Sequence, residues 1–143
     1  LLEKIEVVNS YAGKFSVPYC VATALLHDRV SLENFTMETL RDQHFIHLMS
    51  RVKLEPDTEL DRLYPEKWPA IVTAEMTSGE RYEARVEYPK GDPKNPMTRK
   101  ELINKFHSLT HNIISKPVQD QLVRKCLSLE SLGNARDLLS SFN

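Results

Sequence analysis

Residues 71–88 read IVTAEMTSGERYEARVEY, and the second half of this stretch alternates strictly between apolar and charged side chains. The apolar positions are Tyr82, Ala84, Val86 and Tyr88, and the charged positions between them are Arg81, Glu83, Arg85 and Glu87. A period of two is typical of a β-strand with one face against a core and the other in water. Ser78 and Gly79 supply a turn within the stretch. The sequence therefore predicts a β-hairpin with one wet face.

A proline-rich loop follows this hairpin and leads into helices. Residues 88–98 read YPKGDPKNPMT, in which prolines and a glycine exclude regular structure. Thr98 and Glu101 stand three apart, the spacing of a capping box, so a helix is predicted to begin there. Its apolar stripe comprises Leu102, Phe106, Leu109 and Ile113. Pro117 is predicted to start another helix, because proline is tolerated in a first turn, and residues 135–142 are predicted to form a last short one.

Turn and cap signals also divide the N-terminal half. Residues 5–8 are short and β-branched, which predicts a strand. Ser16 can cap a helix whose first turn holds a proline, and Thr36 and Asp42 can cap a short turn and a further helix. Apolar and charged side chains alternate again over residues 52–57, which predicts a strand that ends near a proline.

These elements together predict an α+β fold. The expected architecture is an antiparallel sheet of about four strands, including the hairpin, with helices packed on it and a helical C-terminal tail. A chain of 143 residues is close to the commonest size of one domain. We therefore expect residues 1–143 to form a single α+β domain.

Composition and charge exclude several classes of partner. Lys and Arg total 19 against 20 for Asp and Glu, and the two signs are interspersed, so neither a basic face nor a nucleic-acid partner is predicted. No apolar run has the length of a membrane span, and the start has no signal-peptide layout, which predicts a cytoplasmic protein or one in an organelle matrix after import. The first residue, Leu1, indicates truncation. Cys20 and Cys126 lie far apart on apolar helical stripes and are predicted to be reduced.

Histidine pairs are the first candidate for chemistry. His107 and His111 are four apart, and His44 and His47 three apart, on predicted helices. Such spacings can place two imidazoles on one metal, but neither pair belongs to an HExxH pattern or has an evident third ligand. We therefore predict no metal site and expect exposed or half-buried histidines.

Two further segments could meet an anionic ligand. Lys90 and Lys94 in the proline-rich loop could hold a carboxylate, although a rigid turn between hairpin and helix is the favoured interpretation. Tyr19 is the better candidate, because it lies in the first turn of a predicted helix, beside unpaired N–H groups and the positive end of the helix dipole. The alternative is a packing residue with a satisfied hydroxyl, and residue physics alone favours that alternative.

Three stretches, which together cover most of the chain, resemble a known family. The first is GKFSVPYCVA at residues 13–22, followed by ALL at 24–26 and RVSLENF at 29–35. The second is the hairpin with its Thr77-Ser78-Gly79 turn, and the third runs from Tyr88 to Phe106. In order and spacing these stretches resemble the C-terminal domain of the MmgE/PrpD family, the group that includes 2-methylcitrate dehydratase and cis-aconitate decarboxylase.

The resemblance implies a domain organisation. Members of the family have a large helical N-terminal domain and a smaller α+β domain, with the active site in the cleft between them. The chain resembles the smaller, substrate-closing domain. The histidines, aspartate and lysines that carry the proton chemistry would then lie in the missing N-terminal domain, so this chain alone is expected to be inactive. The resemblance also implies a homodimer for the intact protein and no iron–sulfur cluster or other cofactor.

The resemblance implies a reaction as well. The intact protein is expected to be a lyase of the kind used in propionate catabolism, acting on a small di- or tricarboxylate such as 2-methylcitrate or cis-aconitate. Loss of water makes it a hydro-lyase, and loss of carbon dioxide makes it a decarboxylase. In decarboxylase-like members a tyrosine in the segment matching Ser16 to Tyr19 faces the substrate. The resemblance therefore implies that Tyr19 binds the substrate. Lys14 and Ser16 belong to the same segment and are further substrate-binding candidates.

Two other hypotheses stay open. One is a non-catalytic binding or assembly module, because these residues hold no complete catalytic set. The other is a small enzyme that stands alone and uses the histidine pairs.

Overall fold

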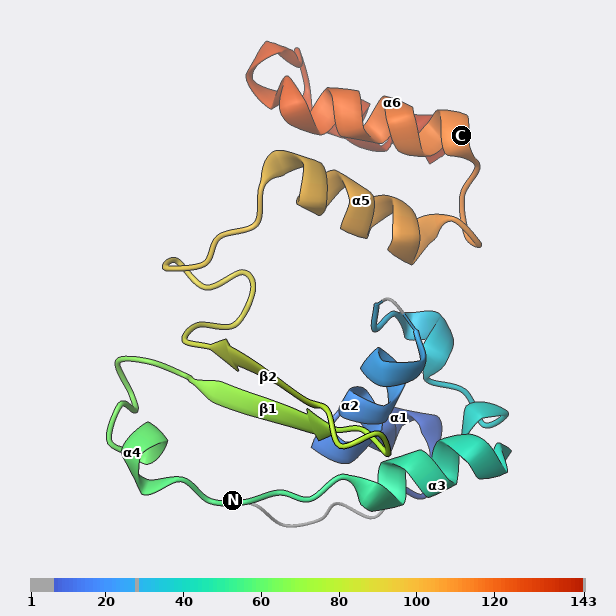
Figure 1. The fold of residues 1–143 in the computed structure, drawn as a ribbon. Coiled ribbons are helices and arrows are strands. Elements are labelled where there is room, and N and C mark those ends of the chain that lie inside the picture. Colours follow the sequence, from blue (N-terminus) through green and yellow to red (C-terminus); the bar gives the residue numbers. More distant parts are fainter. Residues whose placement is uncertain (1–6, 28, 143) are drawn as a thin grey trace. The chain divides into compact units, whose positions relative to one another are not determined.

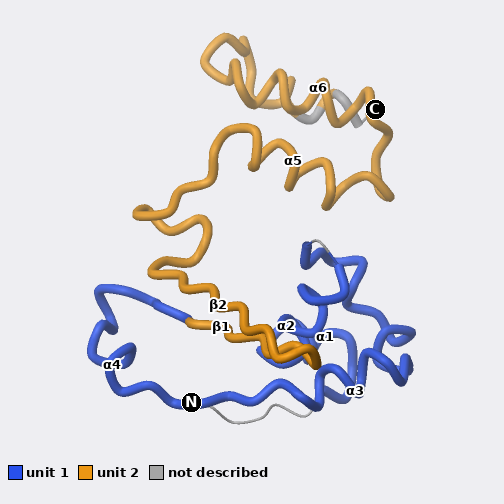
Figure 2. The backbone as a smooth tube through the Cα atoms, in the orientation of Figure 1, with its two compact units in different colours: residues 1–70 blue, residues 71–143 orange. Residues whose placement is uncertain are grey.

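The computed structural model describes residues 7–27 and 29–142 (Figure 1). The chain divides into two compact units, residues 1–70 and residues 71–143, called unit 1 and unit 2 below (Figure 2). A single domain can contain several such units. The expectation of one domain over residues 1–143 therefore stays a prediction.

Short helices make up the first unit. They are α1 (Ser10–Gly13), α2 (Val17–Leu26), α3 (Gln43–Arg51) and α4 (Thr58–Asp61), with two 3₁₀ helices, η1 (Leu32–Asn34) and η2 (Thr39–Arg41). Helix α1 forms because the Asn9 side chain accepts a hydrogen bond from Ala12 N–H and caps it.

The predicted helix caps of unit 1 are confirmed. The Ser16 hydroxyl accepts a hydrogen bond from Tyr19 N–H at 3.3 Å at the start of α2, with Pro18 in the first turn. Asp42 Oδ1 accepts from His44 N–H at 2.8 Å at the start of α3, and Thr36 Oγ1 accepts from Thr39 N–H at 3.1 Å before η2. These contacts satisfy backbone donors that have no partner inside their helices.

The core of unit 1 is aromatic and lies where α2 packs against α3. The Tyr19 ring stacks on Phe35 with ring centroids 5.1 Å apart and is tilted against Phe45 at 4.6 Å. Gly13 approaches the same ring so closely that a Cβ there would lie 3.2 Å from two carbons of Tyr19. Tyr19, Ala22 and Phe45 are fully or almost fully buried. Few side chains therefore hold this unit together.

Neither predicted strand of the N-terminal half forms among the described residues. Residues 52–57 have no strand, so that prediction is wrong: Val52 is the C-cap of α3, and Asp57 is the N-cap of α4. The alternation is real, since Val52 and Leu54 are half-buried, but strand assignment needs a paired neighbour and none is present there. In the predicted strand at residues 5–8, positions 5 and 6 lie outside the described residues. Val7 packs against the core without strand structure.

An exposed pair of aromatic rings follows α4. Tyr64 and Trp68 contact each other edge to face with ring centroids 5.2 Å apart. Both side chains are exposed, at 60%. This pair lies on the surface and contributes no buried core.

The predicted hairpin in unit 2 is confirmed, but side chains on both of its faces are exposed and not on one face alone. Strands β1 (Ala70–Glu75) and β2 (Arg81–Val86) pair with each other, and β1 begins at the boundary between the units. Met76 N–H donates to Glu80 O at 2.8 Å, and Gly79 N–H donates to Met76 O at 2.9 Å. Gly79 has φ +90, a conformation that favours glycine and closes a three-residue hairpin loop.

This hairpin is the only sheet among residues 7–27 and 29–142, so the prediction of about four strands is wrong. The protein is mostly helical, and it is α+β only in the loose sense that one antiparallel hairpin joins the helices. Sheet pairing depends on partners distant in the sequence, whereas the hairpin depends only on its own turn.

Helices form the rest of unit 2, as predicted. They are α5 (Arg99–Thr110), α6 (Lys116–Leu127), and the 3₁₀ helices η3 (Leu129–Ser131) and η4 (Ala135–Phe142). The capping box is confirmed, because Thr98 and Glu101 exchange hydrogen bonds at the start of α5. Helix α6 packs against α5 and against η4. Gln119 is buried in the first of these contacts, and its Nε2 donates to Thr110 Oγ1 at 3.1 Å.

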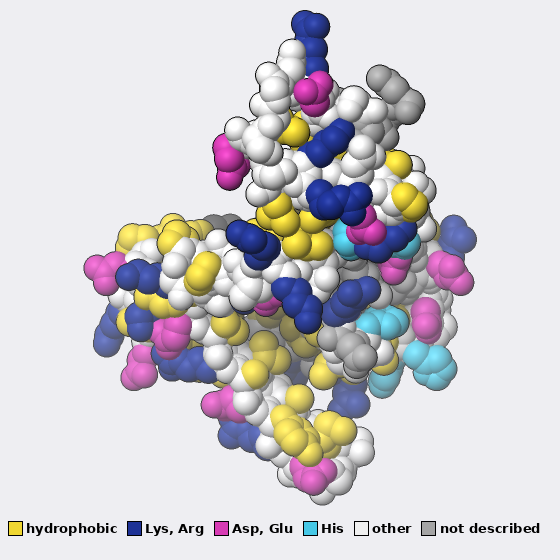
Figure 3. Space-filling model, turned by 90° about the horizontal axis from the view of Figure 1, so that it is seen from above, with side chains coloured by type: hydrophobic (Ala, Val, Ile, Leu, Met, Phe, Trp, Pro, Cys, Tyr) yellow, Lys and Arg dark blue, Asp and Glu magenta, His cyan; other side chains and the backbone are white. Residues whose placement is uncertain are grey.

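Many apolar side chains of unit 2 are exposed to solvent. Thr73 Oγ1 donates to Glu83 Oε2 at 3.4 Å, so these residues share one face of the hairpin. The opposite face, called the hairpin apolar face, comprises Val72, Ala74, Tyr82, Ala84 and Val86 and is exposed or half-buried. The predicted apolar stripe is also exposed in part, since Leu102 on α5 is 53% exposed and Ile113, which lies beyond the end of α5, is 79% exposed. On the face that Figure 3 shows, exposed hydrophobic side chains lie among charged side chains of both signs.

Candidate functional site

The segment that leads into α2 holds the residues predicted to bind a substrate. Tyr19 is 0% exposed, and its hydroxyl donates a hydrogen bond to Asn34 O at 2.6 Å. Burial raises the pKa of Tyr19 above its usual value of 10, and hydrogen bonding with Thr39 and Thr36 offsets part of that rise. The hydroxyl is therefore a neutral donor at physiological pH, and in this structure its acceptor is a backbone carbonyl.

Ser16 and Lys14 occupy different environments. Ser16 is buried beside Tyr19, and its oxygen is the cap acceptor of α2. Lys14 is exposed, with Nζ 5.7 Å from the ring centroid of Tyr11. The structure thus brings Ser16 and Tyr19 together at the start of α2 and places the Lys14 ammonium at the surface. Nothing in these contacts tests a substrate role, so that role stays a prediction.

Cys20 lies next to this segment but is a poor nucleophile. Its Sγ lies 3.9 Å from Gly13 O, and burial raises the pKa of the thiol. A raised pKa keeps the group as the unreactive thiol. Cys20 is half-buried and Cys126 is exposed, and both are free cysteines, as predicted.

The histidine pairs do not assemble a metal site among the described residues. No group of three His, Cys, Asp or Glu side chains in residues 7–27 and 29–142 is placed to hold a metal ion. His111 Nδ1 lies 2.9 Å from Ser108 O, while His107 Nδ1 lies 2.9 Å from Lys116 Nζ. His44 and His47 are exposed on α3. No helix within the described part of the chain is long and apolar enough to cross a membrane.

Hydrogen bonds and an ion pair hold the proline-rich loop in a defined conformation. Asn95 Nδ2 donates to Tyr88 O at 2.9 Å, and Gly91 N–H donates to Asn95 O at 2.9 Å. Lys90 Nζ lies 3.0 Å from Glu101 Oε1, an ion pair that joins the loop to the first turn of α5. The rigid-turn interpretation therefore describes this loop well, and the Lys90 ammonium already has a carboxylate partner.

Glu101 is expected to titrate at about pH 2 in the folded chain. Its pKa is lowered from 4.5 to about 2, first by Thr98 N–H, then by the Thr98 hydroxyl and by Lys90. Because the folded pKa is the lower one, the stability that Glu101 contributes is fully present above about pH 4.5 and is lost as the pH falls through about 2. An NMR titration of the Glu101 side-chain carboxyl carbon measures the midpoint.

Two lysine variants sharpen this test. Lys90→Met is expected to raise the Glu101 midpoint, yet to leave it below 4.5, because both hydrogen bonds from Thr98 remain. Lys94→Met, in the same loop, is the control and is expected to leave the midpoint unchanged. A midpoint near 4.5 in the unmodified chain would show that the capping box is not formed.

The sequence did not predict one polar cluster, which joins α5 and α6. His107 on α5 meets Lys116 and Asp120 on α6, and only the spacing of Lys116 and Asp120, four apart, was visible as a signal. The contact with His107 depends on how two helices pack, which no local pattern encodes.

Comparison with known proteins gives the family. The family described as MmgE/PrpD C-terminal domain matches residues 2–129, which is most of the chain. The MmgE/PrpD family includes lyases. No curated protein matches the chain closely enough to count as a relative. The match confirms the resemblance carried by the Gly13 to Phe35 and Tyr88 to Phe106 stretches, and the chain therefore belongs to the MmgE/PrpD C-terminal domain family.

Proposed function

We propose that this chain is the substrate-closing C-terminal domain of an MmgE/PrpD-type lyase, a dehydratase or decarboxylase of a small di- or tricarboxylate such as 2-methylcitrate or cis-aconitate. Membership of the family over residues 2–129 is the observation that carries the proposal. The intact protein is proposed to contain a helical N-terminal domain and to be a homodimer.

The chemistry of the described side chains supports a domain that is inactive by itself. Elimination next to a carboxylate needs a base within hydrogen-bond reach of the proton and an acid for the leaving group. Within residues 14–20, all of which the structure describes, the titratable groups are Tyr19 and Cys20, both with raised pKa values, and the exposed Lys14. None of them is an evident base for this proton, so the proton chemistry is assigned to the N-terminal domain.

The bare apolar surface supports a partner domain. On the hairpin apolar face of unit 2, Val72 is 42%, Tyr82 58% and Val86 47% exposed, and Leu102 on α5 is 53% exposed. Apolar patches larger than a few hundred Å² usually mark interfaces. The hairpin apolar face and the α5 stripe are therefore proposed to be covered in the intact protein.

Tyr19 has a definite role in this proposal. Its neutral hydroxyl is proposed to donate to a substrate carboxylate, with Ser16 holding the start of α2 in place and Lys14 attracting the anion. In the structure Asn34 O occupies that donor, so binding would require residues 32–36 to release it. Donors aimed at a developing negative charge are an efficient means of stabilising an enolate-like transition state.

The proposal is tested on the two-domain protein with a panel of citrate-like acids. Loss of water or carbon dioxide from one of them is expected, and no turnover of any would contradict the proposed function. Tyr19→Phe is expected to lower kcat/KM by at least about tenfold, since a hydrogen bond to a charged group contributes about 1.5–3 kcal/mol. Tyr11→Phe, an exposed tyrosine beside the same segment, is the control. Unchanged kcat/KM with lower thermal stability would restrict Tyr19 to packing.

A non-catalytic binding or assembly module is the second candidate, and the bare apolar surface favours it as well. Sedimentation velocity and calorimetry on the purified 143-residue chain distinguish the two. A tight oligomer that binds no carboxylate, together with an inactive two-domain protein, would support the module.

A further inference from the structure

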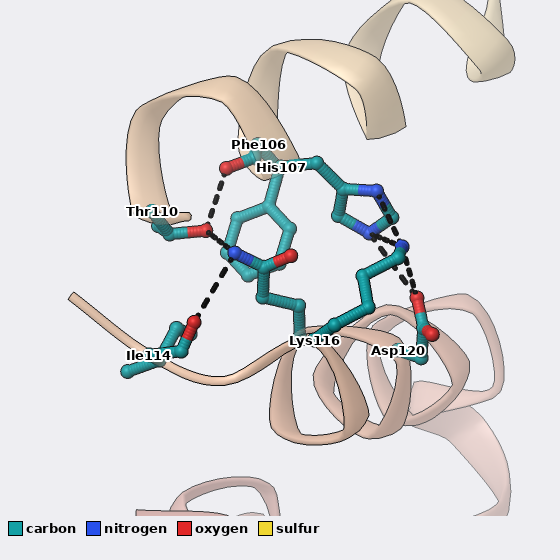
Figure 4. Close-up of polar contacts among 7 residues, drawn as sticks. Phe106, His107, Thr110, Ile114, Lys116 and Asp120 are labelled. Atoms are coloured by element: carbon teal, nitrogen blue, oxygen red, sulfur yellow. Dashed lines mark hydrogen bonds and ion pairs between the residues drawn. The ribbon is translucent and has the colours of Figure 1, made fainter. Parts of the chain in front are cut away.

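The contact between α5 and α6 contains a three-membered polar cluster (Figure 4). Lys116 Nζ lies 2.9 Å from His107 Nδ1 and 3.4 Å from His107 Nε2, and it donates to Asp120 Oδ1 at 2.7 Å. His107 Nε2 lies 3.4 Å from the same Asp120 oxygen. One ammonium therefore joins an imidazole on α5 to a carboxylate on α6.

The position of Lys116 is unfavourable for α6 taken alone. It is the first residue of the helix, close to the positive end of the helix dipole, where a cation is repelled. It also precedes Asp120 by four residues, and a base that precedes its acid is the weaker order for such pairs. The contact with His107 across the helix pair gives this lysine a physical reason to be there.

Buried hydrogen bonds fix the two helices next to the cluster. Gln119, adjacent to Asp120, is 2% exposed, and its Nε2 donates to Thr110 Oγ1 and, at 3.4 Å, to Ile114 O. The Thr110 hydroxyl in turn donates to Phe106 O at 2.7 Å. Because these bonds hold the backbones, a change at His107 is expected to move side chains and not the helices.

The observed contacts favour a neutral imidazole. The Lys116 ammonium lies 2.9 Å from Nδ1 and 3.4 Å from Nε2 of the same ring, so it sits against the face of the ring and not in the ring plane beyond one nitrogen. A protonated ring would place two positive charges in contact at these distances. The Lys116 hydrogen bond holds the pKa of Asp120 below its usual value, so this carboxylate stays charged.

We propose that His107 is a proton-operated latch between α5 and α6. The neutral ring holds Lys116, whereas protonation releases Lys116 and transfers Asp120 to His107 as its ion-pair partner. The charged and titratable groups that face this exchange are Lys116 and Asp120 on α6, Arg124 on α6 through its field at Asp120, and His111 at the C-cap of α5. Release leaves an unpaired cation at the first residue of α6 and weakens that end of the helix.

The test is an NMR titration of the isotope-labelled 143-residue chain from pH 8 to pH 5, the range in which histidine changes charge. The ring nitrogens of His107, Nζ of Lys116 and Cγ of Asp120 are expected to shift in one step with a common midpoint. Below that midpoint the population of the contact between Lys116 and His107 falls about tenfold per pH unit. A Lys116 signal that stays flat would overturn the latch.

Two variants assign the step to one histidine. His107→Gln stays neutral at every pH, so the Lys116 and Asp120 signals are expected to be flat. His111→Gln, at the C-cap of α5, is the matched control and is expected to leave the step intact. A step that persists in His107→Gln, or disappears in His111→Gln, contradicts the proposal. If His107→Gln does not fold, the unmodified chain still tests the proposal: a common midpoint for the His107, Lys116 and Asp120 signals supports it, and different midpoints contradict it. The test does not depend on the proposed lyase function.

Discussion

Replacing Phe45 with alanine is expected to lower the free energy of unfolding of unit 1 by about 3–5 kcal/mol, the usual cost of removing a buried aromatic ring. Phe45 is 1% exposed and packs against the Tyr19 ring at the contact between α2 and α3. Among the described residues of unit 1, Tyr19 and Ala22 are the only buried side chains that share its cluster, so little other core is there to compensate for the lost ring. A loss of this size approaches the whole stability of a small unit.

Amide hydrogen exchange in α2 and α3 measures this effect. Protection is expected to fall by more than about a hundredfold in Phe45→Ala, because each 1.4 kcal/mol is a factor of ten. Phe15→Ala is the control, since Phe15 is 59% exposed and its loss is expected to cost less than about 1 kcal/mol. Equal protection in the two variants would show that the aromatic cluster does not hold α2 on α3.

Replacing Gly13 with alanine is expected to destabilise unit 1 by about 1–3 kcal/mol. The added methyl group would lie 3.2 Å from the Tyr19 ring and 3.3 Å from Phe35. The ring has little room to yield, because Phe35 and Phe45 contact it and its hydroxyl is bound to Asn34 O. This clash outweighs the gain of up to about 1 kcal/mol that alanine offers over glycine in a helix.

Gly133→Ala provides a matched control. A Cβ at Gly133 meets nothing within 4 Å, so the same substitution is expected to change stability by less than about 0.5 kcal/mol. The free energies of both variants follow from urea unfolding monitored by circular dichroism. A Gly13→Ala chain more stable than the unmodified one would mean that the Tyr19 ring moves aside.

Local chemistry in the sequence was sufficient to predict most element starts. Ser16, Asp42 and Thr98 each accept a hydrogen bond from a backbone N–H two or three residues later, and the Ser78-Gly79 turn closes its own hairpin. Such features need no partner from elsewhere in the chain, so residue type and spacing are enough.

The wrong predictions depended on distant partners. An alternating segment at residues 52–57 becomes a strand only if another strand lies beside it, and here it is an extended link between two helices. Of the apolar stripe predicted for the helix after Thr98, Leu102 is exposed on α5, because the pattern shows which face is apolar and not what covers it, and Ile113 lies beyond the end of α5.

In the candidate site, too, local features were predictable from the sequence and contacts between distant residues were not. The sequence predicted that Tyr19 stands in the first turn of a capped helix, and it does. It could not predict the acceptor of the hydroxyl, because Asn34 lies fifteen residues away across a loop. Nor could it predict the cluster of His107, Lys116 and Asp120, which exists only where α5 meets α6.

The aromatic pair after α4 gives the protein an intrinsic optical reporter. Trp68 is the one tryptophan of the chain and is exposed beside Tyr64. An indole already in water emits at long wavelength, so its fluorescence is expected to change little when the rest of the chain unfolds. Emission is expected to shift to the blue only when something covers residues 64–68. Docking of a partner domain onto this segment can therefore be followed without any added label.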